Sequence, residues 1–211
     1  MSLPLTTLVI DTATKACSVA LYHGHDYVAG RYEVIGRGHA EKLIPYIQEL
    51  PGNGRANRIA VNIGPGSFTG IRVGISAAKA LALAWQAECF GYGCLSLVAA
   101  MAKSDGPVDA VMAGGHGEYF FQSFGADGAA QHEPASMKPD AALALSRAPV
   151  IAGDVARQFA ETRGSGEAQE HLPNAAQWHL ISAAKPLAVR PFYGRAPDAK
   201  PAKDLVQSST L

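Results

Sequence analysis

The sequence has no excess of either charge, which limits the partners that the chain could bind on its own. Lys and Arg together number 18, Asp and Glu also number 18, and the formal net charge of the 211 residues is +0 at pH 7. Proteins that bind nucleic acid by themselves neutralise phosphate groups with a basic surface. No run of Lys and Arg supplies such a surface, so we expect no autonomous binding of nucleic acid.

Cysteine is also scarce, and its three positions are Cys17, Cys89 and Cys94. An odd number without the close spacing of paired ligands indicates neither a disulfide framework nor a zinc ribbon. Each cysteine lies in an apolar run, which is typical of a buried thiol. The cysteine content therefore favours a reducing compartment.

A long hydrophobic run is missing as well. The most apolar stretch, 71–87, contains Arg72 and Lys79 and falls short of the roughly 20 apolar residues that a membrane helix requires. The N-terminal segment has no basic region and reaches Asp11 too early for a signal peptide. We expect a soluble, cytoplasmic protein without a membrane span.

Apolar residues nevertheless make up 48% of the chain, which is enough for a hydrophobic core. Short apolar runs in the first half predict five strands, at 8–10, 17–22, 27–34, 58–63 and 89–92. Helical periodicity predicts three helices, at 39–50, 71–87 and 95–103. The order β-β-β-α-β-α-β-α indicates an α/β fold in which helices flank a mixed sheet.

The stretch Ser-Asp-Gly-Pro at 104–107 is the best candidate boundary, and it divides the chain into domains 1–103 and 104–211. The elements that we expect after it are a hairpin of 108–113 and 118–124 around a glycine-rich turn, a strand at 150–151 leading into a helix, a loop at 163–169, a helix at 175–185 and a frayed tail from Pro197.

The segment IGPGSFTGIRVGISAAK (63–79) joins a predicted strand to a helix through a glycine-rich turn. Backbone N–H groups and the helix dipole suit such a turn to an anion, and Ser67 or Thr69 can cap the helix. The turn is not a Walker A loop, because no Gly-Lys-Ser/Thr follows it. The local pattern alone favours a tight, well-capped turn over a phosphate site.

Small residues recur along the helix predicted at 71–87. Gly70, Gly74, Ala78 and Ala82 are spaced by four, which places them on one face. This ridge allows close approach either to the chain's own sheet or to a partner's helix, with the helix at 39–50 beside it. The pattern by itself does not choose between the two interpretations.

Asp11 ends the first predicted strand and is followed by Thr12 and Thr14. A carboxylate beside turn hydroxyls can hold a metal-phosphate group. An aspartate that accepts hydrogen bonds from the N–H groups of its own turn is the commoner arrangement. Neither a Ser/His/Asp triad nor a His pair at helical spacing can be assembled from the sequence.

Four segments carry a resemblance to a known family: LVIDTATKACSVAL (8–21), HAEKLIPYIQEL (39–50), IGPGSFTGIRVGISAAKALALA (63–84) and GYGCLSLVAAMA (91–102). They resemble the TsaB (YeaZ) family, a bacterial component of the machinery that makes threonylcarbamoyladenosine at position 37 of ANN-reading tRNAs. The third segment is long and specific. The resemblance is strong over these segments and weak in the rest of the chain.

The resemblance implies an actin-like/Hsp70-like ATPase fold of two RNase H-like lobes. It also implies a non-catalytic subunit that binds the catalytic paralogue TsaD, is joined by the ATPase TsaE, and forms a homodimer when TsaD is absent. Such a subunit contacts tRNA only through the complex and holds no cofactor of its own. The resemblance leaves open whether ATP or ADP binds at the subunit interface.

Two sets of site residues follow from the resemblance. The partner interface would be formed by two helices, through His39, Leu43, Ile44, Ile47, Gly70, Ile71, Gly74, Ile75, Ala78 and Ala82. A bound nucleotide would lie near Asp11, Thr12, Gly64, Gly66 and Ser67. We expect Gly74→Leu or Ala78→Arg to disrupt association and to leave the fold intact.

The chemistry of the catalytic relatives is incomplete in this sequence. Those relatives carry a His-x-x-x-His metal pair, whereas the matching stretch here begins with His39 and ends with Leu43. One imidazole cannot hold the metal that polarises the substrate. We therefore expect no metal site, no catalytic residue and the role of a pseudo-enzyme partner.

Some positions depart from the family pattern. Segment 113–120 lacks the family's Asp-Ala-Arg, and no glycine follows Asp11 in its turn, which weakens independent ATP hydrolysis; 192–195 resembles the family's closing Tyr-x-Arg. One alternative is an active Mg-ATP-dependent enzyme of the actin-like superfamily that uses Asp11 and the turn 64–70. A metallopeptidase is a second alternative, and the lone His39 argues against it.

Overall fold

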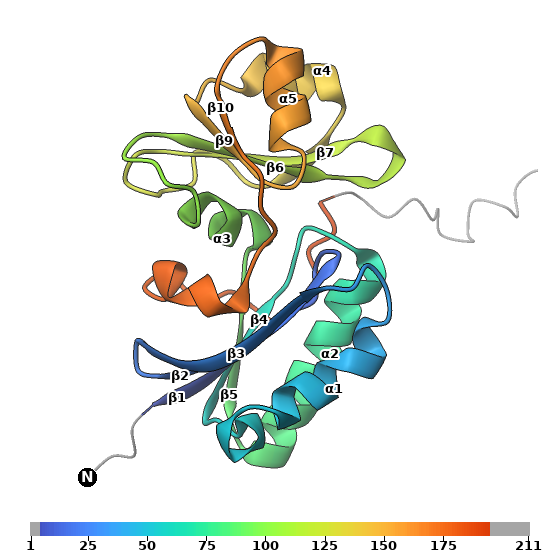
Figure 1. Cartoon of the computed structure of the whole chain (residues 1–211), viewed down its shortest axis with the longest axis vertical. Coiled ribbons are helices and arrows are strands. Elements are labelled where there is room, and N and C mark those ends of the chain that lie inside the picture. The colour runs from blue at the N-terminus through green and yellow to red at the C-terminus, as the bar shows by residue number, and fades with distance from the viewer. Residues whose placement is uncertain (1–4, 195–211) are drawn as a thin grey trace, which may run out of the picture.

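The computed structural model describes residues 5–194, which form two lobes, each built on a five-stranded mixed sheet (Figure 1). The strand order is β3-β2-β1-β4-β5 in the first sheet and β10-β9-β6-β7-β8 in the second. The α/β class and the two-lobed arrangement of mixed sheets with flanking helices are thereby confirmed. The predicted tail from Pro197 and Arg195 of the closing stretch lie outside the described residues.

The first lobe follows the predicted order of elements. Its strands are β1 (Thr6–Asp11), β2 (Ala16–His23), β3 (Asp26–Val34), β4 (Arg58–Asn62) and β5 (Glu88–Tyr92). The first three strands form an antiparallel meander, and β4 and β5 run parallel to β1. The helices are α1 (His39–Gln48) and α2 (Phe68–Trp85), with a 3-10 turn at Pro51–Gly54 between α1 and β4.

Both long helices cover the same face of the first sheet (Figure 1). α2 begins where Ser67 caps it, because the Ser67 hydroxyl accepts a hydrogen bond from the Gly70 N–H at 3.2 Å. It ends at Gln86, which has the left-handed conformation (φ 56°) often found after a helix. Pro45 lies inside α1 without ending it.

The second lobe contains more elements than its sequence predicts. Its strands are β6 (Val108–Ala113), β7 (Tyr119–Phe124), β8 (Ala135–Met137), β9 (Val150–Ala152) and β10 (Glu167–Gln169), and its outer face carries α4 (Pro139–Leu145) and α5 (Ala156–Arg163). The hairpin of β6 and β7 turns through a 3-10 segment at Gly115–Gly117. The loop predicted at 163–169 is wrong, because 167–169 pair with β9. Three-residue strands such as β8 and β10 are too short to show a period of two.

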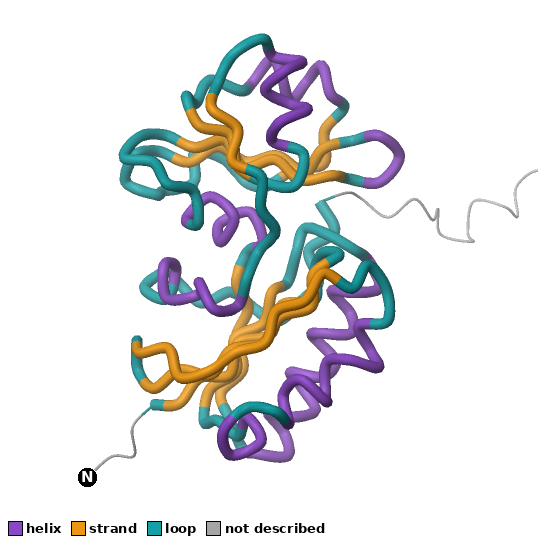
Figure 2. Tube along the Cα trace, in the orientation of Figure 1, coloured by secondary structure: helices purple, strands orange, loops and turns teal. Residues whose placement is uncertain are grey.

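The two lobes do not divide the chain at one point, as the boundary at 104–107 supposed. α3 (Cys94–Ala100) lies between the sheets (Figure 2), where Leu95 and Val98 pack into the core of the second sheet. The chain returns to the first lobe after β10, and Trp178 packs against Tyr22 and Phe90 of the first sheet. Residues 175–194 therefore return to the first lobe, although they lie in the second half of the sequence.

The returning segment also corrects one helix. The helix predicted at 175–185 is a 3-10 helix at Ala175–Ile181, and Pro186 disfavours helical conformation in the residue before it. Leu187 then exchanges two backbone hydrogen bonds with Gly91 at the edge of the first sheet, at 2.8 and 3.0 Å. The Gly194 carbonyl accepts a hydrogen bond from the Ser136 N–H at 3.0 Å, so this segment links the first sheet to β8.

Candidate functional site

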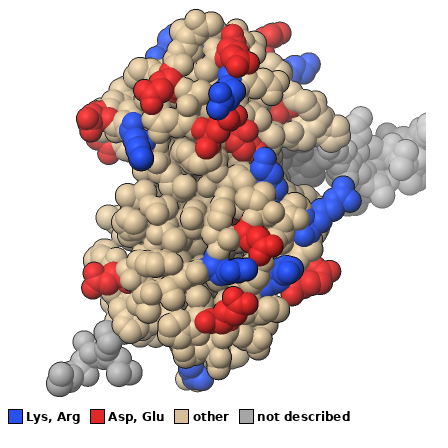
Figure 3. All heavy atoms as spheres, in the orientation of Figure 1, with Lys and Arg blue, Asp and Glu red and all other residues tan. Residues whose placement is uncertain are grey.

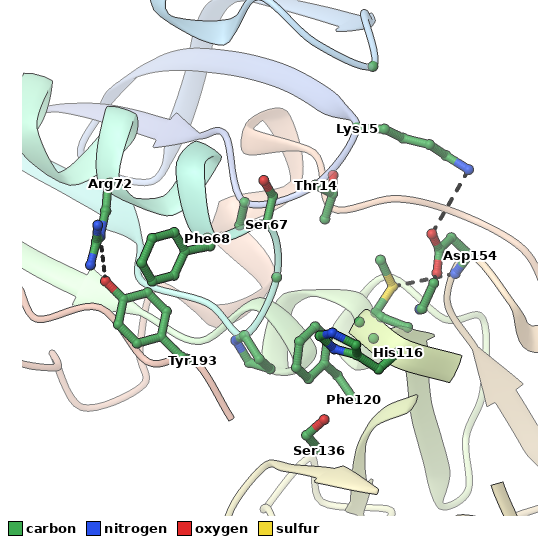
Figure 4. Close-up of a pocket in the computed structure, with 18 residues that line it drawn as sticks. Thr14, Lys15, Ser67, Phe68, Arg72, His116, Phe120, Ser136, Asp154 and Tyr193 are labelled. Carbon is green, nitrogen blue, oxygen red and sulfur yellow. Dashed lines mark hydrogen bonds and ion pairs between the residues drawn. The ribbon is translucent and has the colours of Figure 1, made fainter. Parts of the chain in front are cut away.

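A cavity of about 860 Å³ lies between the lobes and is the candidate binding site (Figure 4). The first lobe contributes the β1–β2 turn at 13–15 and the β4–α2 turn at 65–68. The second lobe contributes residues 112–116 at the end of β6, together with Asp154 after β9. Loops and turns after strands line this space, as is common for ligand sites in α/β proteins.

One side of the cavity is closed by an ion pair between the lobes (Figure 4). Lys15 Nζ of the first lobe lies 3.9 Å from Asp154 Oδ2 of the second lobe. Asp154 is held in place, because its Oδ1 accepts a hydrogen bond from the Ala113 N–H at 2.9 Å. Lys15 is less enclosed than Asp154, because 54% of its side chain is exposed against 15% for Asp154.

An aromatic and cationic stack forms the other side (Figure 4). The Arg72 guanidinium lies 3.6 Å from the centre of the Phe68 ring, and its Nε–H donates to the Tyr193 hydroxyl at 2.7 Å. The Phe68 and Tyr193 rings are 4.8 Å apart. Stacking on aromatic faces is a favourable position for a guanidinium group, so Arg72 and the two rings stabilise one another in this wall.

Asp11, the residue expected to hold a metal-phosphate group, does not line the cavity. Its carboxylate is buried and accepts hydrogen bonds from Asn62 Nδ2 at 2.7 Å, the Tyr92 hydroxyl at 2.9 Å and the Ala13 N–H at 3.2 Å. Burial raises the pKa of Asp11 from 3.8 to about 6, and these hydrogen bonds oppose the rise. Burial also raises the pKa of Tyr92 well above 10, so its hydroxyl remains a donor.

The other residues predicted for a nucleotide are divided between the core and the cavity. Gly66 and Ser67 line the cavity. The buried Thr12 hydroxyl donates to the Gly70 carbonyl at 2.7 Å. Gly64 has φ +104° and a Cβ there would lie 2.7 Å from Ile71 Cδ1, so this position requires glycine to make the turn.

These positions do not fit magnesium and a nucleoside triphosphate as the Mg-ATP alternative supposes. Both oxygens of Asp11 already accept hydrogen bonds from the protein, and Thr12 uses its hydroxyl inside the chain. Magnesium is usually held by one or two carboxylates together with phosphate oxygens and water, and the carboxylate that faces the cavity, Asp154, is already engaged by Lys15 and the Ala113 N–H.

His39 is also bound within the fold. Its Nε2–H donates to the Ala16 carbonyl at 3.2 Å, and Leu43, one helical turn later, is buried in the core. Over residues 5–194, no three His, Cys, Asp or Glu side chains gather as a metal site would require. His39 therefore fixes the start of α1 against β2.

The residues predicted for a partner interface lie mostly inside the chain. All of them are buried except Ile44, which is exposed, and Ala82, which is half-buried. A Cβ on Gly70 would overlap the Thr12 carbonyl, and one on Gly74 would overlap Thr12 Oγ1. The ridge of small residues thus allows α2 to pack against the chain's own first sheet, and its interpretation as a contact between subunits is wrong.

The opposite faces of α1 and α2 are the ones that remain exposed. Leu83 of α2 is 84% exposed and Ile44 of α1 is 41% exposed, and Ala80 and Ala84 are also exposed on α2. Leu83 is not among the interface residues predicted from the sequence, because it lies outside the period of the glycine ridge. We call Ile44, Ala80, Leu83 and Ala84 the outward face.

The sequence analysis also missed most of the cavity wall. Lys15, Arg72 and Asp154 gave no motif, and Tyr193 lies far along the chain from Phe68. The available signal was the glycine-rich turn after each of the two strands β4 and β6. Among described residues, no helix is at once long and apolar enough to cross a membrane. Basic and acidic side chains are interspersed on the visible face of the molecule (Figure 3).

Comparisons with known proteins agree with this fold. The family model described as "TsaD: tRNA N6-adenosine threonylcarbamoyltransferase" matches residues 33–177. The structure is similar to that of YeaZ from Pseudomonas aeruginosa, with a TM-score of 0.75 and 25% identity over 90% of this chain and 99% of that chain.

Curated relatives are similar to this chain in sequence, over part of its length or over nearly all of it. The tRNA threonylcarbamoyladenosine biosynthesis protein TsaB of Escherichia coli (strain K12) is 40% identical over 97 residues, which are 44% of this chain and only 42% of that protein. An uncharacterized protein of Mycobacterium tuberculosis (strain ATCC 25618 / H37Rv) is 31% identical over 205 residues, 93% of this chain and 94% of that protein. The chain belongs to the TsaD family and, within it, to the TsaB (YeaZ) group.

Proposed function

We propose that this protein is a non-catalytic partner subunit in the synthesis of threonylcarbamoyladenosine at position 37 of tRNA. In this proposal it binds a TsaD-like catalytic protein through the outward face of α1 and α2. A TsaE-like ATPase joins the complex, and tRNA is contacted only through it. The protein acts in the cytoplasm and forms a homodimer through the same face when the TsaD-like protein is absent.

The similarity to proteins named for threonylcarbamoyladenosine biosynthesis supports the pathway. The similarity covers less than half of the E. coli TsaB length, so the assembly is our inference rather than a property carried over with the name. The structure supports a partner role over a catalytic one, because Asp11 and His39 both use their polar atoms to hold the fold together.

The observation that carries the proposal is the outward face. Leu83 exposes 84% of its surface on α2, whose opposite face is buried from Gly70 to Ala78. Contiguous exposed apolar residues on a rigid helix are typical of a protein interface. Ile44 is a second exposed apolar side chain, on the neighbouring helix α1, and α1 and α2 pack against each other.

A nucleotide is compatible with this proposal at a different place from the one first predicted. Asp11 and Thr12 use their polar side-chain atoms inside the first lobe. ATP or ADP would therefore have to bind where the partner subunit supplies the groups that hold the nucleotide's metal ion. We propose that any nucleotide in the complex is held mainly by the TsaD-like subunit.

We expect Leu83→Arg and Ile44→Arg each to weaken binding to the TsaD-like protein of the same organism by at least about tenfold. Placing a charge in an apolar contact costs binding free energy, and tenfold corresponds to about 1.4 kcal/mol. Isothermal titration calorimetry on the two purified full-length proteins measures the change. Both residues are exposed, so the variants should unfold at the same temperature as the parent protein.

The matched control is Leu145→Arg, which places the same charge on a residue 51% exposed at the end of α4 in the other lobe. It should bind as the parent protein does. If the parent protein forms no complex, the proposed function is wrong. If it binds and all three variants bind equally, the function stands and the assignment of the outward face is wrong.

A further inference from the structure

We propose that the cavity between the lobes binds, without a metal ion, an apolar ligand that carries a single anionic group. This inference does not depend on the proposed function, because it concerns the cavity and not the outward face. Its volume of about 860 Å³ lies within the range of small-molecule sites, roughly 300–1,000 Å³.

The walls of the cavity are suited to an apolar body. Phe68, Tyr193 and Phe120 present aromatic rings, and Pro65 and Met112 add aliphatic surface between them. The polar atoms of this wall are already used in part, because the Tyr193 hydroxyl accepts from Arg72. A ligand with an aromatic or branched aliphatic body would bury this surface from water, which is the main source of its binding free energy.

The anionic group is inferred from Lys15. Its ammonium lies at the edge of the cavity and contacts Asp154 at 3.9 Å, the limit of an ion pair, while more than half of the side chain is exposed. A pair of this kind contributes little stability, so Lys15 can turn to a ligand at low cost. Asp154 would keep the hydrogen bond from the Ala113 N–H when Lys15 moves away.

The scarcity of carboxylates on the wall argues for a metal-free ligand. Among the described residues that line the cavity, Asp154 alone carries a carboxylate. Three basic side chains, Lys15, Arg72 and His116, also line it. A metal ion would find one carboxylate on this wall, and that carboxylate already contacts Lys15 and accepts a hydrogen bond from the Ala113 N–H. One anionic group paired with Lys15 fits the charges that are present.

The test uses 8-anilinonaphthalene-1-sulfonate, an aromatic body with one sulfonate, titrated into the full chain in EDTA and followed by its fluorescence. We expect saturable binding at one site. Gly115→Phe should weaken it at least about tenfold, because Gly115 lines the cavity, a Cβ there has no atom within 4 Å, and its φ is not left-handed. Lys15→Ala should weaken it about fivefold, and Lys15→Arg should stay within about twofold of the parent protein.

The control is Leu83→Lys, which removes an exposed apolar side chain outside the cavity. It should bind the probe as the parent protein does. The proposal is overturned if Gly115→Phe and Lys15→Ala, both with parental melting temperatures, bind the probe normally. It is also overturned if Leu83→Lys abolishes the signal, or if Mg-ATP displaces the probe and ATP in EDTA does not.

Discussion

Replacing Gly74 with leucine is expected to unfold the protein rather than to detach it from a partner. The side chain would point from α2 into the first lobe, where even a Cβ overlaps Thr12 Oγ1 and lies 3.5 Å from Val61 Cγ2. Leucine adds three more carbon atoms at a site without space for the first. Overpacking of this size destabilises a core by about 4 kcal/mol or more, which urea unfolding measures.

A smaller pair of changes isolates the contact. Gly74→Ala gains about 1 kcal/mol of helix propensity, yet we expect a net loss of about 1–3 kcal/mol because its Cβ meets the Thr12 hydroxyl. Thr12→Ala loses about 1–2 kcal/mol, because the buried hydrogen bond from the Thr12 hydroxyl to the Gly70 carbonyl is removed. The double variant should lose less than the sum of the two, since removing the hydroxyl relieves the overlap.

The control for both substitutions lies on the same helix. Ala80→Leu adds three carbon atoms to an exposed position of α2, and its effect on the free energy of unfolding should stay within about 0.5 kcal/mol. Unfolding of Gly74→Leu at the parental urea concentration would contradict the packing described for α2. It would instead favour contact of this face with another subunit.

Asp11→Ala is expected to destabilise the protein by about 3 kcal/mol and to do so without any ligand present. The substitution leaves three buried donors, Asn62 Nδ2, the Tyr92 hydroxyl and the Ala13 N–H, without their acceptor. Each buried group without a partner costs about 1–3 kcal/mol, and Tyr92 retains a weaker bond to the Ile10 carbonyl at 3.3 Å. Urea unfolding at neutral pH measures the loss.

The pH dependence of stability should show the same carboxyl. The pKa of Asp11 is about 6 in the folded protein and near 3.8 when unfolded, so folding takes up a proton between these values. This contribution to stability is therefore fully present below pH 4 and is lost as the pH rises through 6. The total change is at most about 3 kcal/mol.

Asp11→Asn removes this titration and provides the comparison. The free energy of unfolding of the parent protein minus that of Asp11→Asn should fall between pH 4 and pH 7. Asparagine cannot accept from all three donors, so the variant is less stable at every pH, and only the slope is diagnostic. A difference that rises with pH would show that Asp11 is stabilised as the anion, as a residue that binds a cation would be.

These outcomes also separate the Mg-ATP interpretation from the partner role. If Asp11 served Mg-ATP chemistry, Asp11→Ala would remove turnover and leave the fold stable. The hydrogen bonds of Asp11 instead lead from β1 to β4 and β5 through Asn62 and Tyr92. We therefore expect Asp11→Ala to lower the stability of the fold.

Much of the first lobe could be predicted from local pattern. The meander of β1–β3, the strand β4 and the helix α2 each have a clear period and a capped or glycine-rich end, such as Ser67. The second lobe was harder, because β8, β9 and β10 have three residues each and their pairing is made across the chain. A strand of three residues forms because it pairs with a neighbouring strand.

The sequence by itself determined the class of fold, the order of the long elements and the family, because these depend on residues close together in the chain. Only the tertiary structure decided which way each face points. Spacing by four placed Gly70, Gly74 and Ala78 on one face, but it could not say that β1 and Thr12 cover that face. It could not show either that Asn62 and Tyr92 seal Asp11, or that Tyr193 returns to Phe68 and Arg72. Such contacts join residues distant in sequence, and packing fixes them only when the whole chain is folded.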